Sequence, residues 1–112
     1  MEKTMRMIYI CSPYRAKDEA IRQRNIEYAK QLTREVLLQE MCPIATHLYM
    51  TQCLDDAIKQ ERKIGLAAGQ EILKKCDAIY VGTKYGISAG MKKEMEQAKK
   101  IGITILFDKI ME

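Results

Sequence analysis

Four short runs of apolar, strand-forming residues are spaced along the chain. They cover residues 7–11, 43–46, 77–82 and 103–107. Their apolar side chains fall largely at consecutive rather than alternate positions, which indicates strands that are buried on both faces. Ser12 and Pro13 end the first run and Gly82 ends the third, as turn-forming residues commonly do.

The segments between these runs have helical spacing. Over residues 18–40 one face collects apolar side chains, while Arg, Lys and Glu occupy the opposite face. The members of the apolar face are Ile21, Tyr28, Ala29, Leu32 and Val36. The same spacing predicts two further helices, at residues 60–75 and 88–101. Residues 47–59 are less regular, and the Asp55–Asp56 pair suggests a loop or a helix start there.

Strands buried on both faces that alternate with helices predict an α/β protein with a parallel sheet between two helical layers. The crossovers should be right-handed. Because helix-length crossovers separate the strands, we predict the strand order 2-1-3-4, with a fifth short strand near the C-terminus as an option. The 112 residues suffice for one hydrophobic core, so residues 1–112 are expected to form a single domain. No internal repeat or linker divides them.

In a sheet of this kind, ligands bind beyond the carboxyl ends of the strands, near the point where the strand order reverses. Three loops are expected at that edge, namely residues 12–17, 47–56 and 83–88. We therefore expect the functional side chains to lie in or next to these loops.

The last helix carries a glutamate on its apolar side. Ser88 is a good N-cap for this helix, and Gly86 lies in the turn before it. With about 100° of rotation per residue, the apolar stripe consists of Ile87, Met91, Met95, Ala98 and Ile101. Glu94 lies within the stripe, whereas the neighbouring lysines fall on the outer face. Burial of a lone carboxylate costs several kcal/mol unless the group is paired or borders a cavity.

Gly90 precedes Glu94 by about one helical turn and has no side chain. Because helical side chains lean toward the N-terminus, Glu94 should point over Gly90 toward the strand ends. The glycine leaves space beside the carboxylate and the helix N–H groups, which favours a functional site. The alternatives are a buried arginine that pairs with Glu94 and a rotation of the helix that exposes it. Taken alone, Ser88 is an ordinary cap and Gly90 an accommodation of packing.

The composition, 47% hydrophobic and 30% charged, is typical of a soluble protein, and we expect a cytoplasmic one. No apolar stretch approaches the ~18 residues of a membrane helix, and the chain opens directly into a strand, so neither a membrane span nor a signal peptide is expected. The four cysteines form no Cys-x-x-Cys pair and one histidine accompanies them, so we interpret them as buried free thiols, not metal ligands. A net charge of +4, one Phe and no Trp favour a small anionic ligand over a nucleic-acid polymer.

Several motifs resemble those of the nucleoside 2-deoxyribosyltransferase superfamily. They are residues 8–15 (Ile-Tyr-Ile-Cys-Ser-Pro-Tyr-Arg) and 88–94 (Ser-Ala-Gly-Met-Lys-Lys-Glu), followed by Ala98. The likeness is greatest to small, largely uncharacterised phage and bacterial members. Those share a His-Leu pair after the second strand, a Glu-Arg-x-x-Gly stretch (residues 61–65) and a Cys-Asp pair before the third strand. The resemblance covers most of the chain and implies a flavodoxin-like three-layer sandwich and a homo-oligomer.

The resemblance also implies cleavage of an N-glycosidic bond in a nucleoside or nucleotide. The family's glutamate matches Glu94, which would attack C1′ of the sugar and form a covalent glycosyl-enzyme intermediate. Another base, or water in the hydrolase branch, would resolve the intermediate with retention. Ser88 and Arg15 resemble residues of the human deoxynucleoside 5′-monophosphate hydrolase, which favours a 5′-phosphorylated ligand. Arg15 is equally compatible with an ordinary surface arginine.

The chain departs from the superfamily's pattern at several positions. Gly69 stands where many members carry an aspartate that helps to position the substrate, and Lys92 stands where the family has a glycine. The C-terminal extension by which some transferases complete a neighbour's site is largely absent. The candidates for replacing the missing acid are Asp55, Asp56 and Glu61.

The candidate site therefore combines Glu94 as the catalytic residue with a group of substrate contacts. The expected contacts are Ser12, Tyr14, Arg15, His47, Gly86, Ser88 and Gly90. Of these, Tyr14 and His47 are the candidates for contact with the base. No metal or other cofactor is implied. The alternatives to an enzyme are a module that binds a nucleotide without cleaving it and a phage-derived protein whose surface binds another protein.

Overall fold

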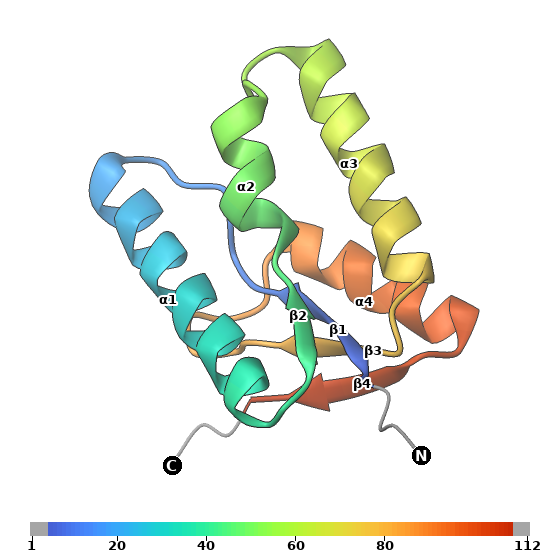
Figure 1. Cartoon of the computed structure of the whole chain (residues 1–112). Helices are drawn as coiled ribbons and strands as arrows, with labels where there is room; N and C mark the ends of the chain where they lie inside the picture. The colour runs from blue at the N-terminus through green and yellow to red at the C-terminus, as the bar shows by residue number, and fades with distance from the viewer. Residues whose placement is uncertain (1–4, 109–112) are drawn as a thin grey trace.

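The computed structural model describes residues 5–108, which form a parallel sheet with helices on both faces (Figure 1). The strands are β1 (Met7–Cys11), β2 (Cys42–Ile44), β3 (Ala78–Val81) and β4 (Thr104–Phe107). The helices are α1 (Glu19–Leu38), α2 (Thr46–Cys53), α3 (Lys59–Lys74) and α4 (Ala89–Ile101). The observed order β2-β1-β3-β4 confirms the predicted fold class and strand order. The optional fifth strand would lie outside the described residues.

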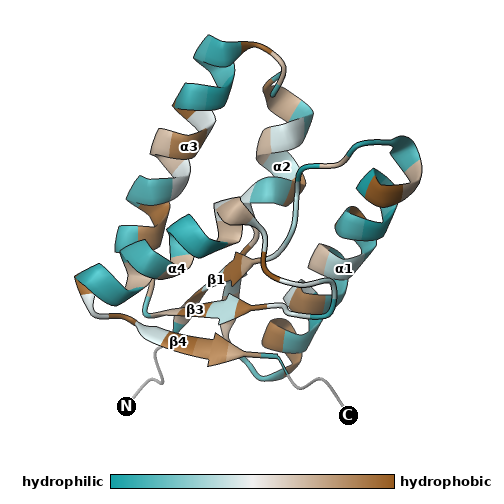
Figure 2. Cartoon of the chain, turned by 180° about the vertical axis from the view of Figure 1, so that it is seen from behind, coloured by the Kyte–Doolittle hydropathy of each residue, from teal (hydrophilic) through white to brown (hydrophobic). Residues whose placement is uncertain are grey.

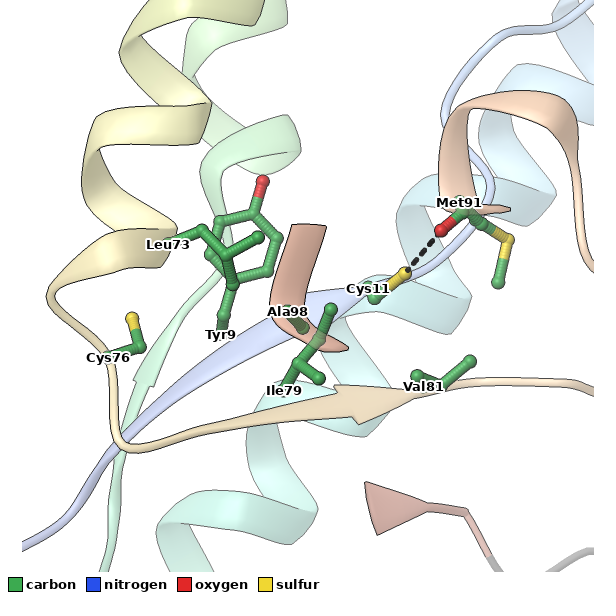
Figure 3. Packing of buried hydrophobic residues seen from close by; sticks show 8 residues of the cluster. All are labelled: Tyr9, Cys11, Leu73, Cys76, Ile79, Val81, Met91 and Ala98. Atoms are coloured by element: carbon green, nitrogen blue, oxygen red, sulfur yellow. Dashed lines mark hydrogen bonds between the residues drawn. The ribbon is translucent and has the colours of Figure 1, made fainter. Parts of the chain in front are cut away.

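Alternate side chains of β1 enter two different hydrophobic cores. Ile8 and Ile10 pack with the buried face of α1. Tyr9 and Cys11 face the opposite way, toward α3 and α4, and Figure 3 shows the Tyr9 ring standing away from the sheet beside Leu73. In the parallel register, Tyr9 pairs with Ile44 of β2 and with Ile79 of β3, so it stands at the centre of the sheet.

Helix α1 begins where the sequence predicts, because Asp18 caps it. The Asp18 carboxylate accepts a hydrogen bond from the backbone N–H of Ile21 at 2.8 Å. The predicted apolar face is buried at four of its five positions, and Ile21 is half-buried. Asn25 is buried as well, and its side-chain amide donates to the carbonyl of Arg15 at 3.2 Å, which ties the loop after β1 to the helix.

Helix α2 differs from the irregular segment that the sequence suggests. It starts at Thr46 after Ala45, which provides no side-chain cap, and it has neither an acid in its first turn nor a base in its last. The usual signals of a helix start and end are therefore missing from the sequence. The Asp55–Asp56 pair does lie in a turn, which leads into α3, and α2 and α3 stand side by side beyond the end of β2 (Figure 1).

Helix α4 buries a narrower stripe than predicted. Met91 and Ala98 are fully buried, whereas Ile87 and Ile101 are 39% and 40% exposed. The lysines lie on the outer face as expected, and Figure 2 shows this helix largely hydrophilic against the apolar strands β1 and β4. Ser88 caps the helix, since its Oγ accepts from the N–H of Met91 at 3.2 Å.

The cysteines are free, as predicted, but they are not all buried. Cys11 and Cys76 lie in the core, and burial raises the pKa of the Cys76 thiol to about 11. Cys42 is half-buried, and Cys53 at the end of α2 is exposed, so the expected burial is wrong for Cys53. The helix α2 that places Cys53 on the surface is the element that the sequence pattern did not show. Among the described residues, no helix is long and apolar enough to cross a membrane.

The loop that leads into α4 is anchored to the core by Asp108. Its Oδ1 accepts hydrogen bonds from the backbone N–H of Thr83 at 3.0 Å and from the Thr83 hydroxyl at 2.9 Å. Its Oδ2 accepts from the Tyr28 hydroxyl at 2.7 Å, and that hydroxyl in turn accepts from the N–H of Lys84 at 3.0 Å. These contacts fix the chain between β3 and α4 and thereby position α4 on the sheet.

Candidate functional site

The Glu94 carboxylate lies on the inner side of α4 and is held by two side chains from other elements. Its Oε2 accepts a hydrogen bond from the Tyr9 hydroxyl of β1 at 2.7 Å and lies 3.3 Å from Nε2 of His47. Its Oε1 is buried and has no hydrogen-bond partner among the described residues. The side chain as a whole is 17% exposed. A buried acceptor without a partner is costly, so this carboxylate is suited to a ligand that approaches it.

Glu94 faces inward as predicted, but it is partly rather than fully buried. The alternative that a buried arginine pairs with it is not observed among the described residues. Within residues 5–108 no arginine or lysine forms an ion pair with Glu94; the side chain beside its Oε2 is instead His47, the one histidine of the chain. The two side chains that contact the Glu94 carboxylate come from β1 and α2, which converge on the inner side of α4. The carboxylate therefore lies at the edge of the sheet where a ligand site was expected.

Tyr9 is a site residue that sequence reasoning missed. Burial, followed by the negative charge of Glu94, raises the pKa of the Tyr9 phenol, so its hydroxyl stays protonated and can donate to the carboxylate. The same oxygen lies 3.2 Å from the hydroxyl of the buried Thr46. The available signal was a phenol within an otherwise apolar strand, because a buried tyrosine hydroxyl usually finds a polar partner.

Tyr14 and His47 form a stacked pair beside the carboxylate. Their ring centroids are 3.8 Å apart and the ring planes differ by 15°. A Cβ atom on Gly90 would lie 2.9 Å from the Tyr14 hydroxyl oxygen and 3.2 Å from its Cε1. The space that we expected to be open above Gly90 is therefore filled by the Tyr14 ring. A side chain at residue 90 would require the Tyr14 ring to shift away from α4.

Two cavities meet at this stacked pair. The smaller, of about 80 Å³, lies between α2 and α3 and includes Tyr9, Gly69 and Glu94 in its lining. The larger, of about 540 Å³, lies between α1 and α2 and includes Arg15 and Asn25. Both cavities are lined by Tyr14, His47, Thr51, Leu54 and Asp56. The stacked rings thus form part of the wall between the Glu94 carboxylate and the larger space.

Two arginines approach Asp56 in this wall. The Nε of Arg15 lies 3.8 Å from one Asp56 oxygen, and the Nε of Arg62 lies 3.9 Å from the other. Arg62 comes from α3 and lines the smaller cavity, and its role was not foreseen from the sequence. Half-exposed ion pairs of this length contribute little to stability, so either guanidinium is available to an anionic ligand.

The remaining predicted contacts are dispersed. Ser12 is buried, and its Oγ has no hydrogen-bond partner among the described residues. Gly86, with a φ of +86°, and Ser88 are exposed and line neither of the two cavities. Of the candidate acids, Asp56 lines both cavities and Glu61 the smaller one, while the Glu61 carboxylate accepts from the backbone N–H of Asp55 at 2.7 Å.

The fold and the site define a flavodoxin-like α/β protein with a carboxylate cavity at the carboxyl edge of its parallel sheet. The chain belongs to the family described as "Domain of unknown function (DUF7768)", whose model matches residues 6–108. No curated protein matches the chain significantly.

Among solved structures, the chain is similar to a 2-deoxyribosyltransferase from the psychrotolerant bacterium Bacillus psychrosaccharolyticus. The TM-score is 0.65 with 15% sequence identity, and the match covers 95% of this chain and 77% of that chain. At this level of identity, the likeness shows a shared fold.

Proposed function

We propose that the chain cleaves or transfers the N-glycosidic bond of a nucleoside, deoxynucleoside or nucleoside 5′-monophosphate. The observation that carries this proposal is the Glu94 carboxylate, held in a cavity at the sheet edge with one oxygen bound by Tyr9 and the other without a partner among the described residues. The fold shared with a 2-deoxyribosyltransferase and the motif around residues 88–94 support it.

In the proposed reaction, Glu94 acts as the nucleophile in two steps. A carboxylate oxygen forms a bond to C1′ while the bond from C1′ to the base nitrogen breaks, and the base leaves with the electron pair and takes up a proton. In the second step an acceptor base or water attacks C1′, loses a proton, and releases the Glu94 carboxylate with net retention. The donors on Oε2 hold the carboxylate in one orientation, which lowers the entropic cost of attack.

The hydroxyl of Tyr9 is expected to contribute as a positioning group. Tyr9→Phe removes a buried hydrogen bond to a carboxylate, and such bonds are worth about 1.5–3 kcal/mol, so the rate of cleavage should fall by about 10- to 100-fold. Tyr80→Phe is the matched control, because Tyr80 donates to the Glu35 carboxylate at the same 2.7 Å on the other face of the sheet. Equal rates for wild type and Tyr9→Phe would remove Tyr9 from the mechanism.

A 5′-phosphate would be bound by Arg15, with Arg62 on the other side of Asp56 as a second cation. Arg15→Ala should weaken binding of a nucleoside 5′-monophosphate by about tenfold or more, and binding of the matching nucleoside much less. The reason is that a charge-assisted contact to phosphate exists only when the phosphate is present. Calorimetric titration with both ligands measures the difference, and Arg34→Ala on the exposed side of α1 serves as the control. Equal losses for both ligands would show that Arg15 does not bind the phosphate.

A second candidate function is a module that binds a nucleotide without cleaving it. Gly69 favours this candidate, because no acid stands at the position where many transferases carry one, and an added Cβ there would lie 3.4 Å from the Tyr9 hydroxyl. A thermal-shift screen of nucleosides and 5′-monophosphates identifies ligands, since binding stabilises the folded state by mass action. Chromatography of the reaction mixtures then separates the two functions: released base supports the enzyme, and intact ligand supports the module.

A further inference from the structure

The Tyr14 ring lies in a confined place between two functional groups. It stacks on His47 at 3.8 Å, and it stands against the backbone of α4 at Gly90, about one turn before Glu94. Burial raises the pKa of the Tyr14 phenol, and the negative charges of Glu94 and Asp56 raise it further. Among the described residues no hydrogen bond holds that hydroxyl, so the ring is kept in place by stacking and packing alone.

The cavity at Glu94 is too small for the ligands proposed for it. Pockets for small molecules usually measure about 300–1,000 Å³, whereas this cavity measures about 80 Å³. The adjoining cavity, of about 540 Å³, is large enough, and Tyr14 and His47 stand between the two spaces. Movement of one of these two rings would join the two spaces and let a nucleoside reach the carboxylate.

Of the two rings, Tyr14 is the less constrained, because no hydrogen bond of its side chain holds it among the described residues. His47 belongs to α2, lies between Thr46 and Leu48 in its first turn, and is tied to Glu94 at 3.3 Å. Tyr14 belongs to the loop between β1 and α1 and has no comparable tie. If the Tyr14 ring left this position, the face of the His47 imidazole next to Glu94 would be exposed.

We propose that Tyr14 occupies the base subsite of the free chain, and that a nucleobase replaces it on the face of His47. The ligand class is a planar heterocycle, and its attachment to a sugar at Glu94 rests on the proposed function. In this arrangement His47 is the surface on which the base stacks, and Tyr14 competes with the base for it. This arrangement determines whether removal of the Tyr14 ring raises or lowers the affinity for a base. Loss of a ligand contact weakens binding, whereas loss of a competitor tightens it.

Tyr14→Ala is the variant that tests this competition, with the free bases adenine, guanine, cytosine and thymine as probes. These probes contain no glycosidic bond, so the result does not depend on cleavage. We expect at least one base to bind Tyr14→Ala about two- to tenfold more tightly than wild type, which is the range set by the strength of a single stacked aromatic pair.

The proton NMR signals of His47 provide a second test of whether a base replaces the Tyr14 ring. The chain has one histidine, so its ring protons are identified without a full assignment. In wild type the stacked Tyr14 ring should shift these signals upfield, and Tyr14→Ala should remove the shift. Saturation of Tyr14→Ala with a base that binds should restore an upfield shift, because the base then stacks on the imidazole.

Two further variants sharpen the test. Tyr49→Ala removes an exposed tyrosine from the same helix as His47 and should leave the affinity and the His47 signals unchanged. The double variant Tyr14→Ala with Gly90→Ala adds a methyl group within 2.9–3.4 Å of the place of three Tyr14 atoms. This methyl narrows the vacated subsite and should cancel the gain in affinity.

An affinity of Tyr14→Ala that equals or falls below that of wild type would overturn the proposal, as would bases that leave the His47 signals unmoved in both proteins. Retention of the full gain in the double variant would show that the base binds elsewhere. Cleavage of nucleosides, assayed on the same samples, is judged separately. Cleavage without a base-dependent shift at His47 refutes the subsite alone, and a shift without cleavage refutes the glycosidase alone.

Discussion

Glu94→Gln is expected to abolish glycosidic cleavage while the fold stays intact. An amide cannot form the covalent glycosyl intermediate, so the rate should fall by roughly three orders of magnitude or more. Binding of the nucleotide should change much less, because the substitution preserves the volume of the side chain and an acceptor for the Tyr9 hydroxyl. Product analysis on wild type and variant, at equal ligand occupancy, measures the loss.

The melting temperature of the same variant decides whether Glu94 is structural. No arginine or lysine of the described residues would lose a partner, and Tyr9 can donate to the amide oxygen, so we expect the free energy of unfolding to change by less than about 1 kcal/mol. Glu96→Gln is the matched control, because Glu96 lies on the exposed side of the same helix. A drop of about 3 kcal/mol in Glu94→Gln alone would make the carboxylate a structural group.

The two measurements together separate the candidate functions. Unchanged stability with cleavage abolished supports Glu94 as the nucleophile. Unchanged stability with no cleavage even in wild type supports the binding module. In that case the buried carboxylate and His47 would serve to recognise a ligand.

Gly82→Ala is expected to destabilise the fold strongly. A Cβ at this position would lie 2.5 Å from Cδ1 of Leu32 and 2.6 Å from the hydroxyl oxygen of Tyr28. Both neighbours are buried, and the Tyr28 hydroxyl also binds Asp108 and Lys84, so the tyrosine cannot shift without loosening the loop before α4. Overpacking of this kind costs about 1–3 kcal/mol, and we expect the upper end of that range, with the melting temperature lower by about 10–20 °C.

Gly69→Ala, in contrast to Gly82→Ala, is expected to stabilise the fold slightly. Its Cβ would lie 3.4 Å from the Tyr9 hydroxyl, which is an ordinary contact, and alanine favours the helix α3 by about 0.5–1 kcal/mol over glycine. Thermal unfolding of both variants tests the contrast. If Gly82→Ala melted like wild type, Tyr28 and Leu32 would have to yield easily, and the anchor at Asp108 would not determine the position of α4.

The strands and three of the four helices were predictable because each depends on patterns within a short segment. Consecutive apolar residues predict burial on both faces, and β1 and β3 are buried in this way. The prediction is wrong for β4, which lies at the edge of the sheet, is half-buried in its middle and leaves Phe107 55% exposed. The helical face of α1 and the caps at Asp18 and Ser88 are likewise local. Helix α2 was missed because it lacks a cap and charged residues at its ends, so its helical state depends on the structure around it.

The candidate site was predictable only in part, because several of its residues lie far apart along the chain. Glu94 was identified because a carboxylate within an apolar stripe is conspicuous in any helix. Its donor Tyr9 lies 85 residues away along the chain, and His47 lies 47 residues away, so no local pattern links them. The exposure of Ile87 and Ile101 was also not predictable, since the width of the buried stripe depends on where α4 rests on β3 and β4.

The sequence by itself determined that a parallel α/β fold forms and that α4 turns a carboxylate inward, because backbone propensity and hydrophobic period are properties of each segment. Only the tertiary structure decided which groups surround that carboxylate. Tyr9, Tyr14 and His47 come from three separate elements, and they meet because the packing of β1, α2 and α4 brings their side chains within hydrogen-bonding and stacking distance. The glycine at residue 90 illustrates the difference: the sequence indicated an empty space, and the folded chain places the Tyr14 ring in it.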